Sequence, residues 1–233
     1  MIQSVAQPLH TRVITGTAAE QELRTMGLDP SSLTRPCAEG LQSAVTSYSP
    51  FEPAIAFGIS IWSKIVGALR YQLNKEGWKQ HDIANAPRSV SPDGGTAIAA
   101  IGGDPQTAHA DGNPRNARTK GPRFANEIEN NAANSSAPRY TQCRLDLGPG
   151  DEETIFADLQ TWVLLYFWDR ASNELRLELS QPIDCDKGFV TQWKTRIIFP
   201  AQDLSGYIDL SSGEDTPPYA ATQDVDFEIT AIS

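Results

Sequence analysis

The residues best suited to chemistry lie in one long polar loop, residues 102–123. Its charged residues are four basic ones and two acidic ones, namely Arg115, Arg118, Lys120, Arg123, Asp104 and Asp111. Arginine and lysine bind carboxylates and phosphates, and several glycines in the loop allow the backbone to approach such a group closely. We therefore expect the four basic residues to bind an anionic group, which is a phosphate, a nucleotide or an acidic surface of a partner protein.

The same loop also suits the active-site lid of a small hydrolase or phosphoryl-handling enzyme. In that interpretation Asp104, at the end of a predicted strand, is the general acid or base, and His109 carries the proton. The leading interpretation is non-catalytic, with no catalytic residue, because the usual enzyme motifs do not occur. There is no G-x-x-x-x-G-K-[ST], and the nearest approach to G-x-S-x-G, residues 58–62, lies inside a helical pattern.

Metal and cofactor sites are not expected. The chain contains neither C-x-x-C nor H-E-x-x-H, which are the spacings that hold zinc. Glu174 and Glu178 lie on a predicted strand, as ligands of Mg²⁺ do in some nucleases, but Arg176 and Arg196 are available to pair with them. We therefore predict cross-strand ion pairs at these positions and no metal.

Charge and cysteine content restrict the partner and the compartment. The net charge of −10 opposes long-range attraction to nucleic acid or to an anionic membrane. The three cysteines, at 37, 143 and 185, are not the even set of a disulfide framework. The first residues lack the pattern of a signal peptide, and no apolar run is long enough to cross a membrane. We predict a cytoplasmic protein with a protein partner.

Residues 1–76 predict a helical N-terminal part. An extended lead-in precedes a short helix at 18–26, and a second short helix is expected to begin close to Pro36, because a proline costs no hydrogen bond at a first helical position. Between 54 and 76, apolar residues recur every three or four positions, which indicates a long and mostly enclosed helix.

Residues 77–233 predict a β-rich part. Three short strands, at 78–83, 88–92 and 96–103, form an antiparallel meander before the polar loop, and a helix opens at Pro122. Further strands are expected at 161–169, 174–182, 188–200, 206–211 and 224–233. In 174–182 leucines alternate with charged residues, so Glu174, Arg176 and Glu178 are expected on a solvated face.

These patterns predict an α+β fold in which the N-terminal helical part packs on a mainly antiparallel β-sheet, in one compact domain with two lobes. The predicted function is that of an interaction or regulatory protein that acts through a partner. Beside the enzyme, a third hypothesis remains open: an acidic inhibitor of a basic protein, as in immunity proteins and antitoxins, which the net charge permits.

Overall fold

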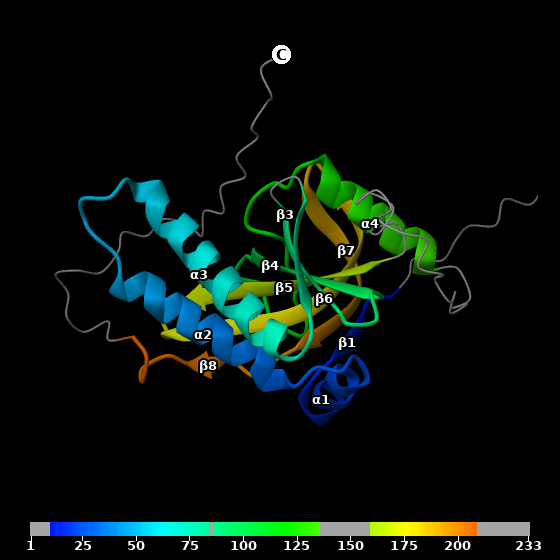
Figure 1. Ribbon diagram of the computed structural model, residues 1–233, viewed down its shortest axis with the longest axis horizontal. Helices are drawn as coiled ribbons and strands as arrows, with labels where there is room; N and C mark the ends of the chain where they lie inside the picture. The colour runs from blue at the N-terminus through cyan, green and yellow to red at the C-terminus, as the bar shows by residue number, and fades with distance from the viewer. Residues whose placement is uncertain (1–9, 84–85, 136–158, 209–233) are drawn as a thin grey trace, which may run out of the picture.

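The computed structural model describes residues 10–83, 86–135 and 159–208, which form four helices and a sheet of eight strands (Figure 1). In chain order these are β1 Arg12–Ile14, α1 Gly16–Thr25, α2 Pro30–Thr46, α3 Ala54–Lys75, β2 Lys79–Ile83, β3 Ala86–Val90, β4 Thr96–Gly102, α4 Pro122–Ser135, β5 Gln160–Asp169, β6 Glu174–Asp186, β7 Phe189–Ile198 and β8 Gln202–Asp203. The predicted α+β class is confirmed.

The sheet is mixed, so the prediction of a mainly antiparallel sheet is wrong. Its strand order is β1-β7-β6-β5-β4-β3-β2, with β8 paired to β6. The meander of β2, β3 and β4 is antiparallel, as predicted, but β4 pairs with β5 in parallel and so does β1 with β7. Parallel neighbours need a long crossover, and the chain between β4 and β5, which contains the polar loop and α4, provides it.

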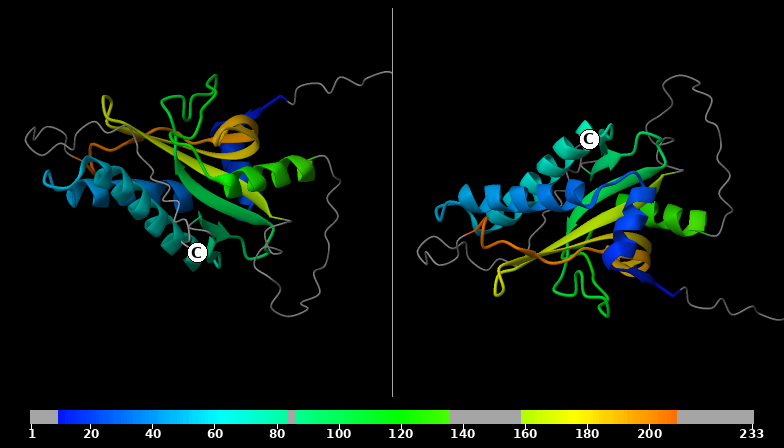
Figure 2. Two further views of the ribbon diagram at one scale, coloured as in Figure 1. Left: turned by 90° about the horizontal axis from the view of Figure 1, so that it is seen from above. Right: turned by 90° about the horizontal axis from the view of Figure 1, so that it is seen from below.

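Helices α1, α2 and α3 lie on one face of the sheet (Figure 2). Of the apolar stripe predicted on α3, Ile55 is 40% exposed, whereas Ile65, Leu69 and Leu73 are buried together with Ile61 beside them. The buried side chains share one apolar core with the residues of β5 and β6 that alternate toward the helices, namely Trp162, Leu164, Tyr166, Trp168, Leu175, Leu177 and Leu179. This face is therefore held by the hydrophobic effect.

The opposite face carries α4 and the polar loop (Figure 2). A smaller apolar cluster joins Phe124 and Ile128 of α4 to Val163 and Leu165 of β5. Around it the contacts are polar. Arg88 of β3 donates to the carboxylate of Glu127 on α4 at 2.8 Å, with both side chains 7% exposed. This face of the sheet therefore contains a buried ion pair in addition to apolar contacts.

Several local predictions need correction. Pro36 lies inside α2, because Pro30 already occupies the start of the helix and the Asp29 carboxylate caps it by accepting from the backbone N–H of Ser31. The lead-in contains the short strand β1, which was not predicted. Gly206 and Tyr207 form a turn where a strand was expected. Ile208 is not in a strand either. Residues 209–211, the strand at 224–233 and Cys143 lie outside the described residues.

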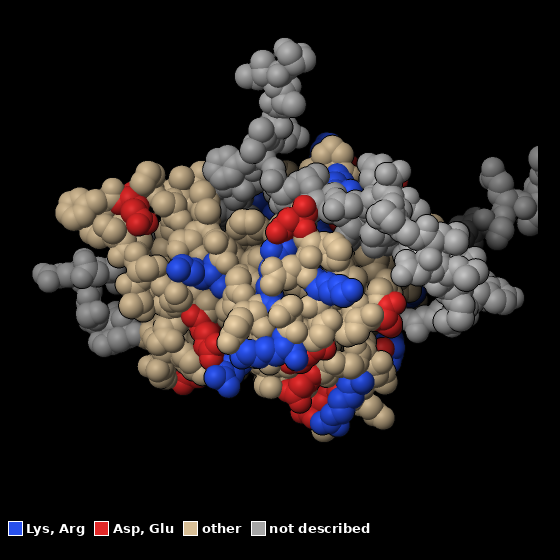
Figure 3. Space-filling model, viewed as in Figure 1, with Lys and Arg blue, Asp and Glu red and all other residues tan. Residues whose placement is uncertain are grey.

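No helix among the described residues is both long and apolar enough to cross a membrane. On the face viewed in Figure 3, basic and acidic side chains are interspersed, so the net negative charge does not form one uninterrupted acidic surface there.

Candidate functional site

The polar loop, defined from here on as residues 103–121, connects β4 to α4 and is folded into successive tight turns. The backbone N–H of Thr107 donates to the carbonyl of Asp104, that of His109 to Gln106, and that of Gly112 to His109, at 3.0 to 3.2 Å. Its backbone is therefore hydrogen-bonded within the loop, although the sequence offers few apolar side chains to bury.

A buried ion pair lies under the loop. Glu178 of β6 is 0% exposed and Arg196 of β7 is 2% exposed. The guanidinium of Arg196 donates from Nε to Oε1 of Glu178 at 3.0 Å and from Nη2 to Oε2 at 2.5 Å. Ser180, which faces Arg196 in the strand register, also donates to Oε1 at 2.7 Å. The predicted cross-strand pairing is thus present here, but the expected solvated face is wrong at Glu178, because the loop covers it.

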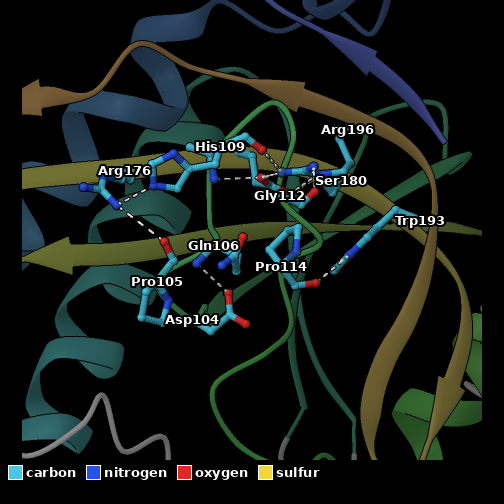
Figure 4. A network of polar contacts seen from close by, with 12 residues as sticks. Asp104, Pro105, Gln106, His109, Gly112, Pro114, Arg176, Ser180, Trp193 and Arg196 are labelled. Atoms are coloured by element: carbon cyan, nitrogen blue, oxygen red, sulfur yellow. Dashed lines mark hydrogen bonds and ion pairs between the residues drawn. The ribbon is translucent and has the colours of Figure 1, made fainter.

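Both members of the ion pair bind the loop backbone, and Figure 4 shows the contacts of Arg196. Oε2 of Glu178 accepts from the N–H of Ala108 at 2.9 Å. Arg196 donates from Nη1 to the carbonyl of Gly112 at 2.6 Å and from Nη2 to that of His109 at 3.0 Å. The ion pair between β6 and β7 therefore also holds residues 108–112 of the loop.

Two further side chains attach the second half of the loop. The indole N–H of Trp193 donates to the carbonyl of Pro114 at 2.9 Å (Figure 4). The amide of Asn116 donates to the carbonyl of Gly188 at 2.8 Å and accepts from the N–H of Val190 at 2.8 Å. Asn116 thereby joins the loop to the turn between β6 and β7. There the backbone of Lys120 lies so close to Gly188 that a Cβ atom on Gly188 would overlap it.

Three of the four predicted anion-binding residues lie in the loop, the fourth lies at the start of α4, and their neighbours differ. Arg115 is exposed, and its carbonyl accepts from the N–H of Asp104 at 3.1 Å. Arg118 and Lys120 are half-buried beside the β6–β7 turn, where the N–H of Lys120 donates to Gly188. Arg123 lies in the first turn of α4, 3.7 Å from the Glu127 carboxylate. The structure thus places the backbone of Arg118 and of Lys120 beside the β6–β7 turn, and in the described part of the chain no contact joins all four residues in a single cluster.

The two residues of the enzyme hypothesis are Asp104, which is half-buried, and His109, which is exposed (Figure 4). Nη1 of Arg176 is 2.8 Å from Nε2 of His109, and Nη2 is 2.5 Å from the Asp169 carboxylate. Because a guanidinium only donates, Nε2 of His109 is the acceptor that this hydrogen bond requires. Burial raises the pKa of Asp104, and the nearby Glu178 charge adds to the rise, against hydrogen bonds from the backbone N–H groups of Gln106 and Arg115.

Sequence reasoning did not identify the residues that hold the loop. Glu178 and Arg196 were expected only to pair with each other or with nearby charges, and Asn116 and Trp193 were not connected with the loop. A usable signal was the arginine directly before the apolar run of Ile197, Ile198 and Phe199, since a charge at the start of a buried stretch requires a partner.

The loop can present polar side chains at fixed positions, because Glu178, Arg196 and Trp193 form hydrogen bonds with its backbone. Among residues 10–83, 86–135 and 159–208 there is no group of three or more His, Cys, Asp or Glu side chains placed to hold a metal ion.

A scan of protein-family models and searches of curated proteins and of solved structures found no match to this chain.

Proposed function

We propose that this protein is a non-catalytic interaction or regulatory protein that binds an anionic group of a partner through the basic residues of the polar loop and the start of α4. The observation that carries the proposal is the attachment of the loop backbone to the buried Glu178–Arg196 pair. In the attached loop the Arg115 side chain is exposed and the Arg118 side chain is half-buried.

A fixed loop favours binding because ordering has already occurred before the partner arrives. Loops on a rigid scaffold commonly carry binding residues, and arginine pairs with carboxylate or phosphate through two parallel hydrogen bonds. The helices and the sheet provide the scaffold, and the loop provides the contacts.

The charge distribution supports a protein, a phosphate or a nucleotide as the anionic partner in preference to a nucleic acid. A chain of net charge −10 repels a polyanion at long range, whereas a small group of arginines and lysines still binds a local anion. We place this activity in the cytoplasm, where the predicted free thiols stay reduced.

Native mass spectrometry of the protein purified gently from its own cells tests the proposal, because it reports bound proteins, small anions and metals together. Replacing Arg115 and Arg118 by alanine is expected to weaken binding of the partner found, without a change in melting temperature. The matched control is Arg35→Ala, which removes an exposed arginine of α2 that pairs with Glu39 in the same helix. Equal partner affinity in the Arg115/Arg118 variant would contradict the proposal.

A second candidate function, phosphoryl handling with the loop as a lid, is favoured by the placement of two carboxylates. Asp104 follows β4 and Asp169 ends β5, and these strands are parallel neighbours, so both acids stand at the carboxyl edge where ligands of such sheets commonly bind. This hypothesis predicts saturable hydrolysis of p-nitrophenyl phosphate that Asp104→Asn abolishes. A retained small anion without a protein partner would support it, whereas a tight complex with a basic protein would support the acidic inhibitor.

A further inference from the structure

We propose that Glu178 and Arg196 are the positioning residues of the polar loop: they select the shape in which the loop presents its binding surface, and they are not needed to hold β6 against β7. This inference rests on the proposed function, because it concerns the same loop, but it makes a separate statement about what determines the loop's shape.

The first argument is the energetic character of a buried ion pair. Moving two charges out of water costs about as much as their attraction returns, so an apolar pair of similar volume generally supports a fold equally well. Glu178 and Arg196 are 0% and 2% exposed, and the strands that carry them are already paired by backbone hydrogen bonds over many residues. Joining the two strands is therefore not sufficient to explain this pair.

The second argument is the match between each charge and the loop. The carboxylate lies under a backbone donor, the N–H of Ala108, and the guanidinium lies under two backbone acceptors, the carbonyls of His109 and Gly112. Exchanging the two charges would preserve their mutual attraction but place a donor under a donor and an acceptor under acceptors. The polarity of the pair is thus specific for the loop backbone.

The third argument is that no large apolar side chain selects the loop's shape, and that Trp193 and Asn116 attach only its second half. Its buried residues are Gly103, Thr107, Pro114 and Asn116, none of which is a large apolar side chain. Ala108 adopts φ 61°, a left-handed conformation that alanine disfavours. The Ala108 N–H donates to Glu178 in that conformation, so the carboxylate stabilises a shape that local preferences oppose.

The experiment compares three variants of the full chain: the apolar pair Glu178→Leu/Arg196→Met, the exchanged pair Glu178→Arg/Arg196→Glu, and Arg196→Lys. Hydrogen exchange reports the order of the loop and of the β6–β7 pairing separately. Binding is measured with inorganic pyrophosphate and with a synthetic oligoglutamate peptide. The control is Arg12→Lys, in an exposed ion pair with Glu22, which is expected to change none of these measurements.

In the apolar pair we expect the β6–β7 amides to stay protected, the Ala108 amide to exchange at least about tenfold faster, and probe binding to weaken at least about tenfold. Wild-type exchange at Ala108 in that variant would overturn the proposal, and so would full recovery of loop protection in the exchanged pair, since recovery would show that the ion pair matters regardless of its polarity.

If neither double variant folds, Arg196→Lys decides, because lysine keeps the charge and loses the fork that reaches Glu178, His109 and Gly112 together. Faster exchange confined to the loop supports the proposal, and unchanged exchange there overturns it. If the wild-type protein binds neither probe and the loop still loosens in these variants, the proposed function is contradicted while the positioning role is supported.

Discussion

A Cβ atom on Gly103 would overlap the side-chain hydroxyl of Thr107, which is wholly buried beneath the first turn of the polar loop. Gly103→Ala must therefore push Thr107 away, and we expect it to lower the free energy of unfolding by about 1–3 kcal/mol. Urea unfolding measures the loss. Thr107→Ala removes the overlapping oxygen, so adding it to Gly103→Ala is expected to recover part of the stability.

The matched control for this pair is Gly121→Ala, where an added Cβ meets no atom within 4 Å. An unchanged unfolding free energy in Gly103→Ala would mean that the loop moves away from β4 without cost, which would contradict its close packing.

Ala108 is the loop residue whose backbone favours glycine, because its φ is 61°. Glycine adopts this conformation without the steric penalty of a Cβ, and the gain exceeds the entropy that glycine adds to the unfolded chain. We expect Ala108→Gly to raise the free energy of unfolding by about 0.5–1 kcal/mol. Its exposed neighbour offers the control: Ala110→Gly is expected to lower stability. Thermal unfolding that ranks the two variants in the opposite order would refute the prediction.

The stability contributed by Asp104 depends on pH in the direction opposite to that of an ion-paired acid. Burial and the Glu178 charge raise the pKa of Asp104, so the folded protein holds this proton more tightly than the unfolded chain. The group therefore destabilises the fold above its folded pKa, and this penalty disappears as the pH falls through that pKa. Asp104→Asn removes the penalty while its side-chain oxygen still accepts from Gln106.

We accordingly expect Asp104→Asn to be more stable than the wild-type protein at neutral pH, and the difference to shrink in acid. Urea unfolding across this pH range measures both. A difference that is independent of pH would show that the carboxyl group is ionised equally in the folded and unfolded chains.

Asn131 fixes α4 to the sheet through backbone groups. Its side chain donates to the carbonyls of Thr161 and Pro182, at 2.8 and 2.9 Å, and accepts from the N–H of Thr161 at 2.9 Å. Asn131→Ala leaves these buried groups without their partner, and we expect a loss of about 2–3 kcal/mol in the free energy of unfolding. The half-buried neighbour provides the control, Asn130→Ala. Because alanine favours a helix more than asparagine does, Asn130→Ala is expected not to lower stability. A similar loss in both variants would contradict the anchoring role of Asn131.

The elements of this fold were predictable where side chains repeat with a clear period. The apolar spacing at Ile65, Leu69 and Leu73 identified α3, and the continuous apolar run from Trp162 identified β5 as a central strand. The parallel pairing of β4 with β5 was not predictable, because it depends on the route of a long crossover and not on either strand alone.

The candidate site was predictable as a segment but not as an arrangement. Composition singled out the loop and its arginines, since they are a local excess of basic charge in an acidic chain. Glu178 and Arg196, which hold the loop, are remote from it in sequence. The alternation of Glu178 with leucines resembles that of an ordinary strand with one solvated face. Only the folded backbone, which places Ala108 and Gly112 over Glu178 and Arg196, reveals their environment.

The parallel pairing of β1 with β7, which joins Arg12 to Thr195 and Ile14 to Ile197, has a consequence for synthesis on the ribosome. The helices that follow β1 emerge long before the strands that cover them, so their apolar faces remain exposed while most of the chain is translated. Contacts this distant in sequence also slow folding. Newly made chains are therefore open to aggregation until β7 emerges, which makes the nascent chain, more than the finished protein, the form that requires chaperone protection.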